Sequence, residues 1–369
     1  MSVAPGVGII GAGNVLPAYL QVLDRLVPRG LAREGPICAR RPEGWPELLR
    51  RRPGAQLVAD PSEVVEADVD VVVVLTPPES HAALTRLALE HGKHVVVEKP
   101  FAENRAEGEE LFHLAEERGL HLLAAPFVQL SPTFRAFWTI VDAGELGHVH
   151  SARALYGNAG SHWTTWYHSG GPGPLGEAGI YNLKSLTALL GAVVEVFAAE
   201  TVAVAKRLAG GIEIASPDPD VSLVVLRHAT GALSSVVSSQ AIQQYRRPAL
   251  ELYGSSGTAN LLGDDWDPRG FEVWRNENGF WERHDAIEPT WLWADGLREA
   301  VACVREGRPP LSSPEHDLHL LDVLDAARAS VAERAAVPVD SSFARLELRF
   351  EAPAGVELLH DHTRPSDEQ

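Results

Sequence analysis

Short apolar segments alternate with helical patterns along the first 125 residues, and this alternation restricts the possible folds more than any other feature of the chain. The run at Val69–Leu75 reads VDVVVVL and is continuous, as in strands that are covered on both faces. Amphipathic helical patterns separate most of these runs. Strands are predicted at 7–10, 36–39, 56–59, 69–75, 95–97 and 120–125. Residues 1–125 are therefore predicted to form an α/β domain with a doubly wound parallel sheet.

The sequence pattern changes after Pro126. Helices are predicted at 133–143, 177–190, 291–305 and 318–335, and short strand patterns with turn residues fill the region from 193 to about 282. This mixture predicts an α+β domain with a mostly antiparallel sheet at 126–350, followed by a polar tail at 351–369. Two domains also agree with the length of 369 residues, which exceeds that of one ordinary core.

Net charge and cysteine content exclude several classes of function. The formal net charge of −18 argues against binding to nucleic acid or to an anionic membrane surface, since both require a basic protein surface. No apolar run approaches the roughly 20 residues that span a bilayer, and the N-terminus lacks the basic region of a signal peptide. Cys38 and Cys303 form neither a disulfide framework nor a metal-binding spacing. We therefore expect a cytoplasmic protein with no membrane or nucleic-acid partner.

Two histidine pairs have the close spacing of metal ligands. They are His148 with His150, and His360 with His362. Neither pair has a third ligand at a suitable spacing, so no metal site is predicted.

A glycine turn follows the first predicted strand. Gly11 and Gly13 stand in the sequence GAGN, and a helical pattern of leucines begins directly afterwards. Strand, glycine turn and helix together direct backbone N–H groups and a helix N-terminus at a diphosphate. The predicted dinucleotide contacts here are Gly11, Gly13, Asn14 and Val15. Leu16 stands where a third glycine is usual, and a tight turn without a ligand is the alternative.

The end of the second predicted strand bears on the choice between NAD and NADP. An acidic residue at this point grips the ribose hydroxyls of NAD, but here Ala39 is followed by Arg40 and Arg41. Guanidinium groups suit a 2′-phosphate because they bind it in a planar, bidentate manner. NADP is therefore the expected cofactor, with NAD possible. Two solvated arginines without a ligand are the alternative.

The stretch Val95–Phe101, VVVEKPF, predicts a buried strand that ends in a charged pair and a proline. Open α/β sheets place their ligands at the carboxyl ends of the strands. Burial also lowers the pKa of a lysine, which suits Lys99 for carrying a proton. An exposed lysine at an ordinary strand exit is the alternative. The loop with Thr76 and Pro77 is expected at the same edge of the sheet.

Four blocks together resemble the Gfo/Idh/MocA oxidoreductases, the family of glucose–fructose oxidoreductase and inositol dehydrogenase. The blocks read GVGIIGAGN, LTPPESH, VVVEKPF and GGPGPLGEAGIYNLKSLTALLG, and the resemblance covers residues 5 to 345. It implies a Rossmann domain followed by a substrate-binding α/β domain with a large open sheet. It also implies oxidation or reduction of a hydroxyl–carbonyl pair, usually on a sugar or cyclitol, with NAD or NADP. The open sheet commonly makes the subunit contact, so a homodimer or homotetramer is expected.

The resemblance also assigns roles to individual residues. Lys99 matches the lysine beside the nicotinamide and the reacting oxygen, and Glu98 matches the acid that approaches the nicotinamide ribose. Pro100 matches a proline whose peptide bond is often cis. Glu177 stands at a position that is usually Asp. Tyr181 matches a position that is His in the inositol dehydrogenase branch and is similar to the tyrosine of the glucose–fructose oxidoreductase and dihydrodiol dehydrogenase branch.

These assignments predict the proton chemistry. An alcohol that loses a hydride must also lose its hydroxyl proton, and an ammonium group beside a phenol favours the phenolate. Tyr181 and Lys99 are therefore the expected proton-transfer pair, although a core tyrosine with a satisfied hydroxyl is the alternative. Glu177 lies four residues before Tyr181, which predicts one helical face for both and an orienting role for the carboxylate.

The remaining expected contacts come from loops. Those to the cofactor are His81 and Gln129, in addition to Thr76 and Pro77, and those to the substrate are Trp163, Trp166 and His168. Aromatic faces suit the C–H side of a sugar ring, and simple core packing is the alternative.

Two other functions are consistent with these motifs. One is a catalytically silent dinucleotide-binding protein that serves as a sensor or partner, as the absent third glycine and Glu177 suggest. The other is a reductase of C=C or C=N bonds of the biliverdin reductase kind. The polar, aromatic stretch before residue 169 makes this second alternative less favoured.

Overall fold

The structure is a computed structural model that describes residues 4–162, 168, 170–246 and 248–350. The chain divides into two compact units. The first comprises residues 1–130 and 292–321, and the second comprises residues 131–291 and 322–369. Among the described residues, no helix combines the length and the apolar character that a membrane span needs.

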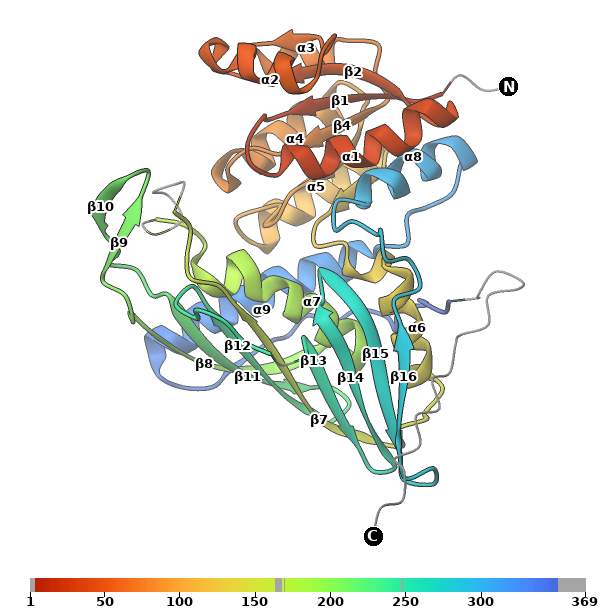
Figure 1. Ribbon diagram of the computed structural model, residues 1–369, viewed down its shortest axis with the longest axis vertical. Helices are drawn as coiled ribbons and strands as arrows, with labels where there is room; N and C mark the ends of the chain where they lie inside the picture. The colour runs from red at the N-terminus through yellow and green to blue at the C-terminus, as the bar shows by residue number, and fades with distance from the viewer. Residues whose placement is uncertain (1–3, 163–167, 169, 247, 351–369) are drawn as a thin grey trace. The chain divides into compact units, whose positions relative to one another are not determined.

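The first unit contains a six-stranded parallel sheet, which confirms the predicted doubly wound α/β fold (Figure 1). The strand order is β3-β2-β1-β4-β5-β6, so the direction of winding reverses between β1 and β4. The strands are β1 (Gly6–Ile10), β2 (Arg33–Cys38), β3 (Leu57–Val58), β4 (Val71–Val74), β5 (His94–Val97) and β6 (Leu122–Ala124).

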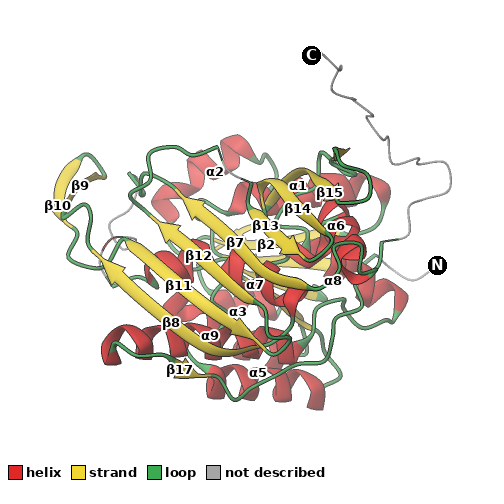
Figure 2. Ribbon diagram, turned by 90° about the horizontal axis from the view of Figure 1, so that it is seen from below, coloured by secondary structure: helices red, strands yellow, loops and turns green. Residues whose placement is uncertain are grey.

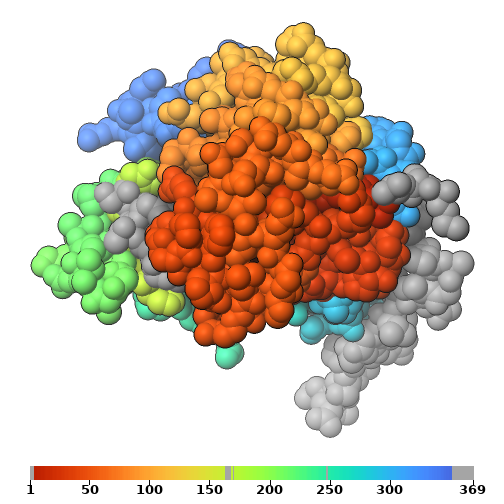
Figure 3. Space-filling model, turned by 90° about the horizontal axis from the view of Figure 1, so that it is seen from above, coloured from red at the N-terminus to blue at the C-terminus, as the bar shows by residue number. Residues whose placement is uncertain are grey.

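Helices cover both faces of this sheet, as the continuous apolar strands predict. They are α1 (Leu16–Leu26), α2 (Trp45–Arg51), α3 (Pro61–Val65), α4 (His81–Glu90), α5 (Arg105–Glu117) and α8 (Gly296–Glu306). Val73 of β4 packs in one core with α1 and α8, and its neighbour Val72 packs in the other core with α4 and α5. On the face drawn in Figure 3, red to orange segments make up most of what is visible of this unit. The predicted helix at 291–305 begins only at Gly296, and α2 was not predicted.

Gly11 directly follows β1 and lies against the residues that follow β4. Its φ is 113°, and a Cβ there would lie 2.7 Å from the carbonyl carbon of Leu75. Only glycine accepts both this conformation and this contact without strain. A Cβ at Gly13, in contrast, would have no described heavy atom within 4 Å. The two glycines therefore meet different needs, close backbone packing at Gly11 and open space above Gly13.

The second unit is built on a nine-stranded, mostly antiparallel sheet, which confirms the α+β prediction (Figure 2). Its order is β16-β15-β14-β13-β7-β12-β11-β8-β17, and the pair β7–β12 is parallel. The strands are β7 (Val149–Gly157), β8 (Val193–Thr201), β11 (Val221–His228), β12 (Leu233–Ser239), β13 (Leu250–Gly254), β14 (Gly257–Asp264), β15 (Asp267–Arg275), β16 (Trp281–Asp285) and β17 (Val337–Pro338). A separate hairpin consists of β9 (Lys206–Ala209) and β10 (Ile212–Ala215).

Two helices, α6 (Pro132–Asp142) and α7 (Ile180–Leu190), pack on one face of this sheet (Figure 2). The indole N–H of Trp138 in α6 donates to the carbonyl of Ala188 in α7, at 2.9 Å. A long helix, α9 (Pro314–Glu333), begins in the first unit and ends in the second. Side chains of β11 alternate accordingly, with Val224 buried under the helices and Val225 exposed on the other face.

The helix predicted at 177–190 begins with a π-helical turn at Leu175–Gly179, and α7 follows it. This turn is wider than an α turn, and Glu177 and Tyr181 both stay partly exposed while the other residues from 174 to 188 are buried. Glycines at 176 and 179 permit the close packing of this turn, and a Cβ at Gly179 would lie 3.0 Å from that of Ser238. The hydroxyl of Ser238 also donates to the carbonyl of Pro174, at 2.7 Å.

Candidate functional site

The carboxyl edge of the parallel sheet carries the cofactor residues that the sequence predicts. Loops after β1, β2, β4 and β5 and the segment after β6 contain them, as expected for an open α/β sheet. They are Gly11, Gly13, Asn14, Val15, Arg40, Arg41, Thr76, Pro77, His81, Glu98, Lys99 and Gln129.

Glu98 is held from two sides at this edge. Its Oε1 accepts the hydroxyl of Tyr19 at 2.7 Å, and its Oε2 accepts the backbone N–H of Lys99 at 3.2 Å. The peptide bond that follows, Lys99–Pro100, is cis. Tyr19 lies on α1, and its ring packs edge-to-face on Trp293 with centroids 5.8 Å apart. The start of α1 and the end of β5 are thereby joined by a buried hydrogen bond.

Sequence reasoning missed Tyr19. The buried face of α1 otherwise consists of aliphatic side chains, so the one phenol in this stripe was a usable signal. A buried tyrosine hydroxyl requires a polar partner, and here the partner is the carboxylate of Glu98.

His81, the first residue of α4, connects two loops of the site. Its Nδ1 lies 2.8 Å from the carbonyl oxygen of Pro100, and its Nε2 lies 2.6 Å from that of Thr76. The ring is buried. His81 therefore holds the loops after β4 and β5 together, and it would influence a ligand by way of these loops.

Gln129 lies in the short 3-10 turn η4 (Val128–Leu130) and is buried. Neither its amide nitrogen nor its amide oxygen has a hydrogen-bond partner among the described residues. Buried polar groups are nearly always paired, so an orphaned amide at this edge suits a ligand that both donates and accepts hydrogen bonds.

Arg40 and Arg41 are exposed and lie next to the glycine turn. The N–H of Gly11 donates to the carbonyl of Cys38 at 3.0 Å, which brings the end of β2 against the turn. Within the described part of the chain, neither guanidinium forms an ion pair. Both are thus available to an anionic group placed over the turn.

The second unit presents the other predicted catalytic residues on its surface. From position 174 to 188, only Glu177 and Tyr181 are not buried. Glu177 lies in the π-helical turn and Tyr181 in the first turn of α7. Both side chains can therefore meet a ligand at the surface of this unit.

A buried carboxyl that the sequence did not indicate anchors the start of α7. Asp265 lies between β14 and β15, and its Oδ2 accepts the amide of Asn182 at 2.9 Å and the hydroxyl of Ser185 at 3.0 Å. Asn182 directly follows Tyr181, so this anchor sets the orientation of the turn that carries the phenol. Burial, as the largest cause, raises the pKa of Asp265 from its ordinary value of 3.8 to about 7.

Tyr156, at the end of β7, lies close to the same group. Burial, followed by the negative charge of Asp264, raises its pKa to about 12, and Asp265 and Glu177 contribute in the same direction. The pKa of Asp264 is itself raised by burial, although its Oδ1 accepts the hydroxyl of Tyr245 at 2.5 Å. The phenol of Tyr156 thus stays protonated and can donate a hydrogen bond near Glu177.

Of the three predicted substrate residues, the structure describes one, His168. Trp163 and Trp166 lie outside the described residues. His168 is buried, and its Nε2 lies 2.7 Å from the carbonyl oxygen of Ser161. Among the described residues, no group of three or more histidine, cysteine or acidic side chains is arranged to hold a metal ion.

Two family profiles match this chain. The oxidoreductase family with an NAD-binding Rossmann fold (GFO_IDH_MocA) matches residues 6–125, and the GFO/IDH/MocA C-terminal domain matches residues 134–260. Together they cover most of the chain and confirm the resemblance inferred from the four sequence blocks.

Related proteins match over nearly their whole length. The trans-1,2-dihydrobenzene-1,2-diol dehydrogenase of Bos taurus is 27% identical over 337 residues, which are 88% of this chain and 96% of that protein. The structure of levoglucosan dehydrogenase in complex with NADH and L-sorbose has a TM-score of 0.80 at 19% identity, covering 92% of this chain and 100% of that one. An oxidoreductase domain protein from Kribbella flavida has a TM-score of 0.81 at 23% identity, with the same coverage. At these identities the two structures establish the fold alone.

Replacing Asp265 with asparagine should change how stability depends on pH. Between about pH 4 and pH 7 the folded state holds a proton on Asp265 that the unfolded chain releases, so the free energy of unfolding falls as pH rises. Each unit between the two pKa values corresponds to about 1.4 kcal/mol. Denaturant unfolding at pH 5 and pH 8 should show that Asp265→Asn gains stability relative to the native protein at the higher pH.

The control for this measurement is Asp267→Asn, a partly exposed carboxylate in the same hairpin. The native protein and Asp267→Asn should lose stability in parallel between the two pH values. If the free energy of unfolding changed with pH equally in the native protein and in Asp265→Asn, the assignment of the proton to Asp265 would be contradicted.

Proposed function

The chain belongs to the Gfo/Idh/MocA oxidoreductase family, and on this basis we propose that it transfers a hydride between a nicotinamide cofactor and a hydroxyl or carbonyl group of a sugar- or cyclitol-like substrate. One observation carries this proposal. The glycine turn, Lys99 and the orphaned amide of Gln129 belong to loops and turns at one edge of a parallel sheet, where such folds bind dinucleotides.

The residues at this edge fit a dinucleotide. Open space above Gly13 leaves room for a diphosphate at the N-terminus of α1, where the helix dipole favours an anion. Gln129 offers a buried donor and acceptor that match a carboxamide. A bound nicotinamide would supply the hydride acceptor or donor. The remaining contacts would be Asn14, Val15, Thr76, Pro77 and Glu98, with His81 supporting the loops.

NADP is the cofactor that we propose. Arg40 and Arg41 are exposed beside the glycine turn and have no ion-pair partner in the described chain, which suits recognition of a 2′-phosphate. An acidic residue that would grip the ribose hydroxyls of NAD is absent from the end of β2 at positions 38–41.

Lys99 and Tyr181 are the groups that we propose for proton transfer at the reacting oxygen. Lys99 extends from the carboxyl end of β5, and Tyr181 reaches the surface of its unit. An ammonium group facing the same oxygen stabilises negative charge on it and favours loss of its proton, which the phenolate form of Tyr181 would accept. Glu177, with Tyr156 near it, would orient neighbouring hydroxyl groups of the substrate.

The substrate class follows from these polar groups. Glu177, Tyr181 and the protonated phenol of Tyr156 supply both donors and acceptors, as adjacent hydroxyl groups require. The bovine relative is named for a vicinal diol, and the structural relative is named for an anhydrosugar. Trp163, Trp166 and His168 are proposed to contribute to this substrate side.

Self-association is proposed to occur through the face of the large sheet on which no described helix packs, called the helix-free face below. Exposed apolar side chains gather there on β8, β11 and β12: Phe197, Leu223, Val225 and Leu233. Val225 lies directly opposite Phe197, so these strands form a contiguous patch of the kind that marks an interface. A homodimer or homotetramer would bury it.

A cytoplasmic location is also proposed. Cys38 and Cys303 are both buried and unpaired, as is usual in a reducing compartment. Fractionation of the source cells tests this location.

Removing either proton-transfer group should reduce turnover and leave cofactor binding intact. Lys99→Ala and Tyr181→Phe should each lower kcat by about 10²- to 10⁴-fold with NADPH and a panel of sugar-like carbonyl compounds. Lys206→Ala and Tyr253→Phe, which alter an exposed lysine and a tyrosine on the helix-free sheet face, are the matched controls. Unchanged turnover in both catalytic variants would refute these roles. Tight NADPH binding by a native protein that turns over no substrate of the panel would favour the dinucleotide sensor.

Reversing the charge at Arg40 should weaken NADPH binding about 10- to 100-fold, since a charge-assisted bond to phosphate is lost. Arg40→Asp should also bind NADH at least as tightly as the native protein does. Arg29→Asp makes the same charge change at another exposed position of the unit and should alter neither affinity. Fluorescence titration measures both constants, and a native preference for NADH would contradict the assignment to NADP.

A charge placed in the apolar patch should dissociate the oligomer. Leu223→Glu, at a position that is 52% exposed in the single chain, should shift the mass measured by sedimentation toward that of a monomer. Leu208→Glu, on the separate hairpin, should leave the mass unchanged. A native protein that sediments as a monomer would contradict this interface.

A further inference from the structure

The connection between β8 and β11 is much longer than the sheet requires. These strands are antiparallel neighbours with Thr201 opposite Val221, and a two-residue turn suffices to join such a pair. The chain instead leaves the sheet for residues 202–220 and forms the β9–β10 hairpin. We call residues 202–220 the strap. Because the sheet does not need a connection of this length, the role of the strap is inferred from its contacts outside the sheet.

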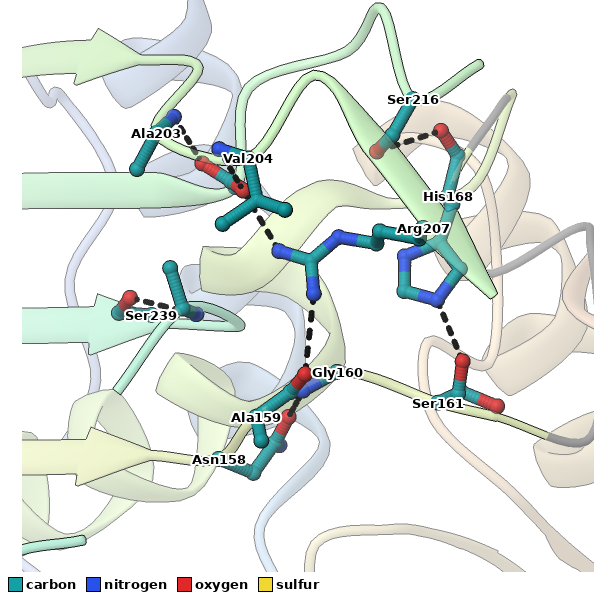
Figure 4. A network of polar contacts seen from close by, with 12 residues as sticks. Asn158, Ala159, Gly160, Ser161, His168, Ala203, Val204, Arg207, Ser216 and Ser239 are labelled. Carbon is teal, nitrogen blue, oxygen red and sulfur yellow. Dashed lines mark hydrogen bonds and ion pairs between the residues drawn. The ribbon is translucent and has the colours of Figure 1, made fainter. Parts of the chain in front are cut away.

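The strap binds the described residues of one segment, 158–170, at both ends of that segment. The bonds are Arg207 Nη1 to the carbonyl of Ala159 (3.0 Å), the N–H of Gly210 to the carbonyl of His162 (2.8 Å), the hydroxyl of Ser216 to the carbonyl of His168 (3.5 Å) and the N–H of Gly170 to Oδ2 of Asp218 (2.6 Å). We call the described residues of this segment, 158–162, 168 and 170, the loop. Figure 4 shows several of these contacts around Arg207.

Arg207 and Asp220 form the centre of this arrangement. Nη2 of Arg207 donates to Oδ2 of Asp220 at 2.6 Å, and the two side chains are only 7% and 2% exposed. Asp220 also accepts the N–H groups of Ala203 and Val204, at 2.6 and 3.0 Å. A buried ion pair gives little net stability compared with apolar side chains of the same size, so stability alone is a weak reason for it. The planar guanidinium of Arg207 does fix the orientation of the loop relative to Asp220, because it binds both at the same time.

The loop backbone is shaped to fit this guanidinium. Gly160 has a φ of 84°, and a Cβ there would lie 2.3 Å from Nη1 of Arg207. Its N–H donates to the side chain of Asn158 at 2.8 Å, and the N–H of Asn158 donates to the carbonyl of Ser239 at 2.9 Å. Any larger residue at position 160 would push the loop away from the strap. His168 further connects the two described parts of the loop through Ser161.

Both flanks of the loop lie beside the proposed catalytic segment of the same unit. Before the loop, Tyr156 is close enough to Glu177 for the charge of the carboxylate to affect the phenol. After the loop, a Cβ at Gly176 would lie 2.9 Å from that of Pro172. A displacement of the loop would therefore alter the surroundings of Glu177.

We propose that Arg207 and Asp220 are positioning residues for substrate recognition. They hold the described loop residues beside the segment that carries Glu177 and so influence which sugar-like substrates are accepted. This inference rests on the proposed function. The pair takes no part in proton or hydride transfer. Binding groups that are held in place before the ligand arrives give higher affinity, so loss of the pair should raise KM more than it lowers kcat.

Variants of the pair and of its exposed neighbour test this inference. The probe is the sugar-like carbonyl compound of the NADPH panel that the native protein reduces fastest. Arg207→Met and Asp220→Asn should raise KM for this compound about 10- to 100-fold and leave the dissociation constant for NADPH unchanged. Arg207→Lys keeps the charge but cannot bind Asp220 and Ala159 in one plane. It should have the same melting temperature as the native protein and still show a raised KM. Lys206→Met removes an ion pair whose side chains are 73% and 68% exposed on the same hairpin, and it should change neither quantity.

Hydrogen exchange provides a readout that is independent of activity. Peptides covering residues 158–162 and 168–170 should exchange faster in Arg207→Met and Asp220→Asn than in the native protein or Lys206→Met. If Arg207→Met does not fold, the same exchange measurement is made on Asp218→Asn. This variant weakens the bond from the N–H of Gly170 to the partly exposed side chain of Asp218, and its loop should also exchange faster. Unchanged exchange in the loop would overturn the strap's holding role. Faster exchange with an unchanged KM would overturn the role in recognition. A native protein without turnover would overturn the proposed function, while exchange would still decide whether the strap holds the loop.

Discussion

At the carboxyl edge of the parallel sheet, Gly11 has no room for a side chain. Its backbone packs on Leu75 and Thr76, and this contact joins the glycine turn to the loop after β4. His81 then links the carbonyl of Thr76 to that of Pro100 in the loop after β5. Three loops from separate parts of the chain are thus connected, by backbone packing at Gly11 and by the imidazole of His81. The rest of the proposed cofactor site depends on this connection, because the loops carry its contacts.

A buried side-chain bond completes the same edge. Tyr19 extends from α1 to the carboxylate of Glu98, so the helix after the glycine turn and the strand before Lys99 keep a fixed relation. Such a site is organised before a ligand binds, which lowers the entropic cost of binding. Buried polar contacts also hold segments of the second unit in place. Asp265 anchors the first turn of α7 beside Tyr181, and the strap with Arg207 and Asp220 holds the loop that precedes it.

The sequence predicted the features that depend on local patterns. Continuous apolar runs predicted the strands of the parallel sheet, and the glycine turn and VVVEKPF both lie at its carboxyl edge, as the sequence predicted. It did not predict features that arise from contacts between distant residues. The π-helical turn at Glu177 depends on packing against Ser238, and Asp265 meets Asn182 across more than eighty positions of the chain. The strap was predicted only as part of a strand-rich region, because nothing in its local pattern shows that Arg207 is buried or what it binds.

We propose that Lys99 and Tyr181 act on one substrate oxygen beside a bound nicotinamide. A crystal structure of the protein with NADP and a non-reacting polyol would decide this. We expect Nζ of Lys99 and the phenol oxygen of Tyr181 both to lie within hydrogen-bonding distance, about 3 Å, of the same hydroxyl oxygen of the polyol. A complex in which that hydroxyl contacts neither group, or in which the nicotinamide lies away from Lys99, would contradict it.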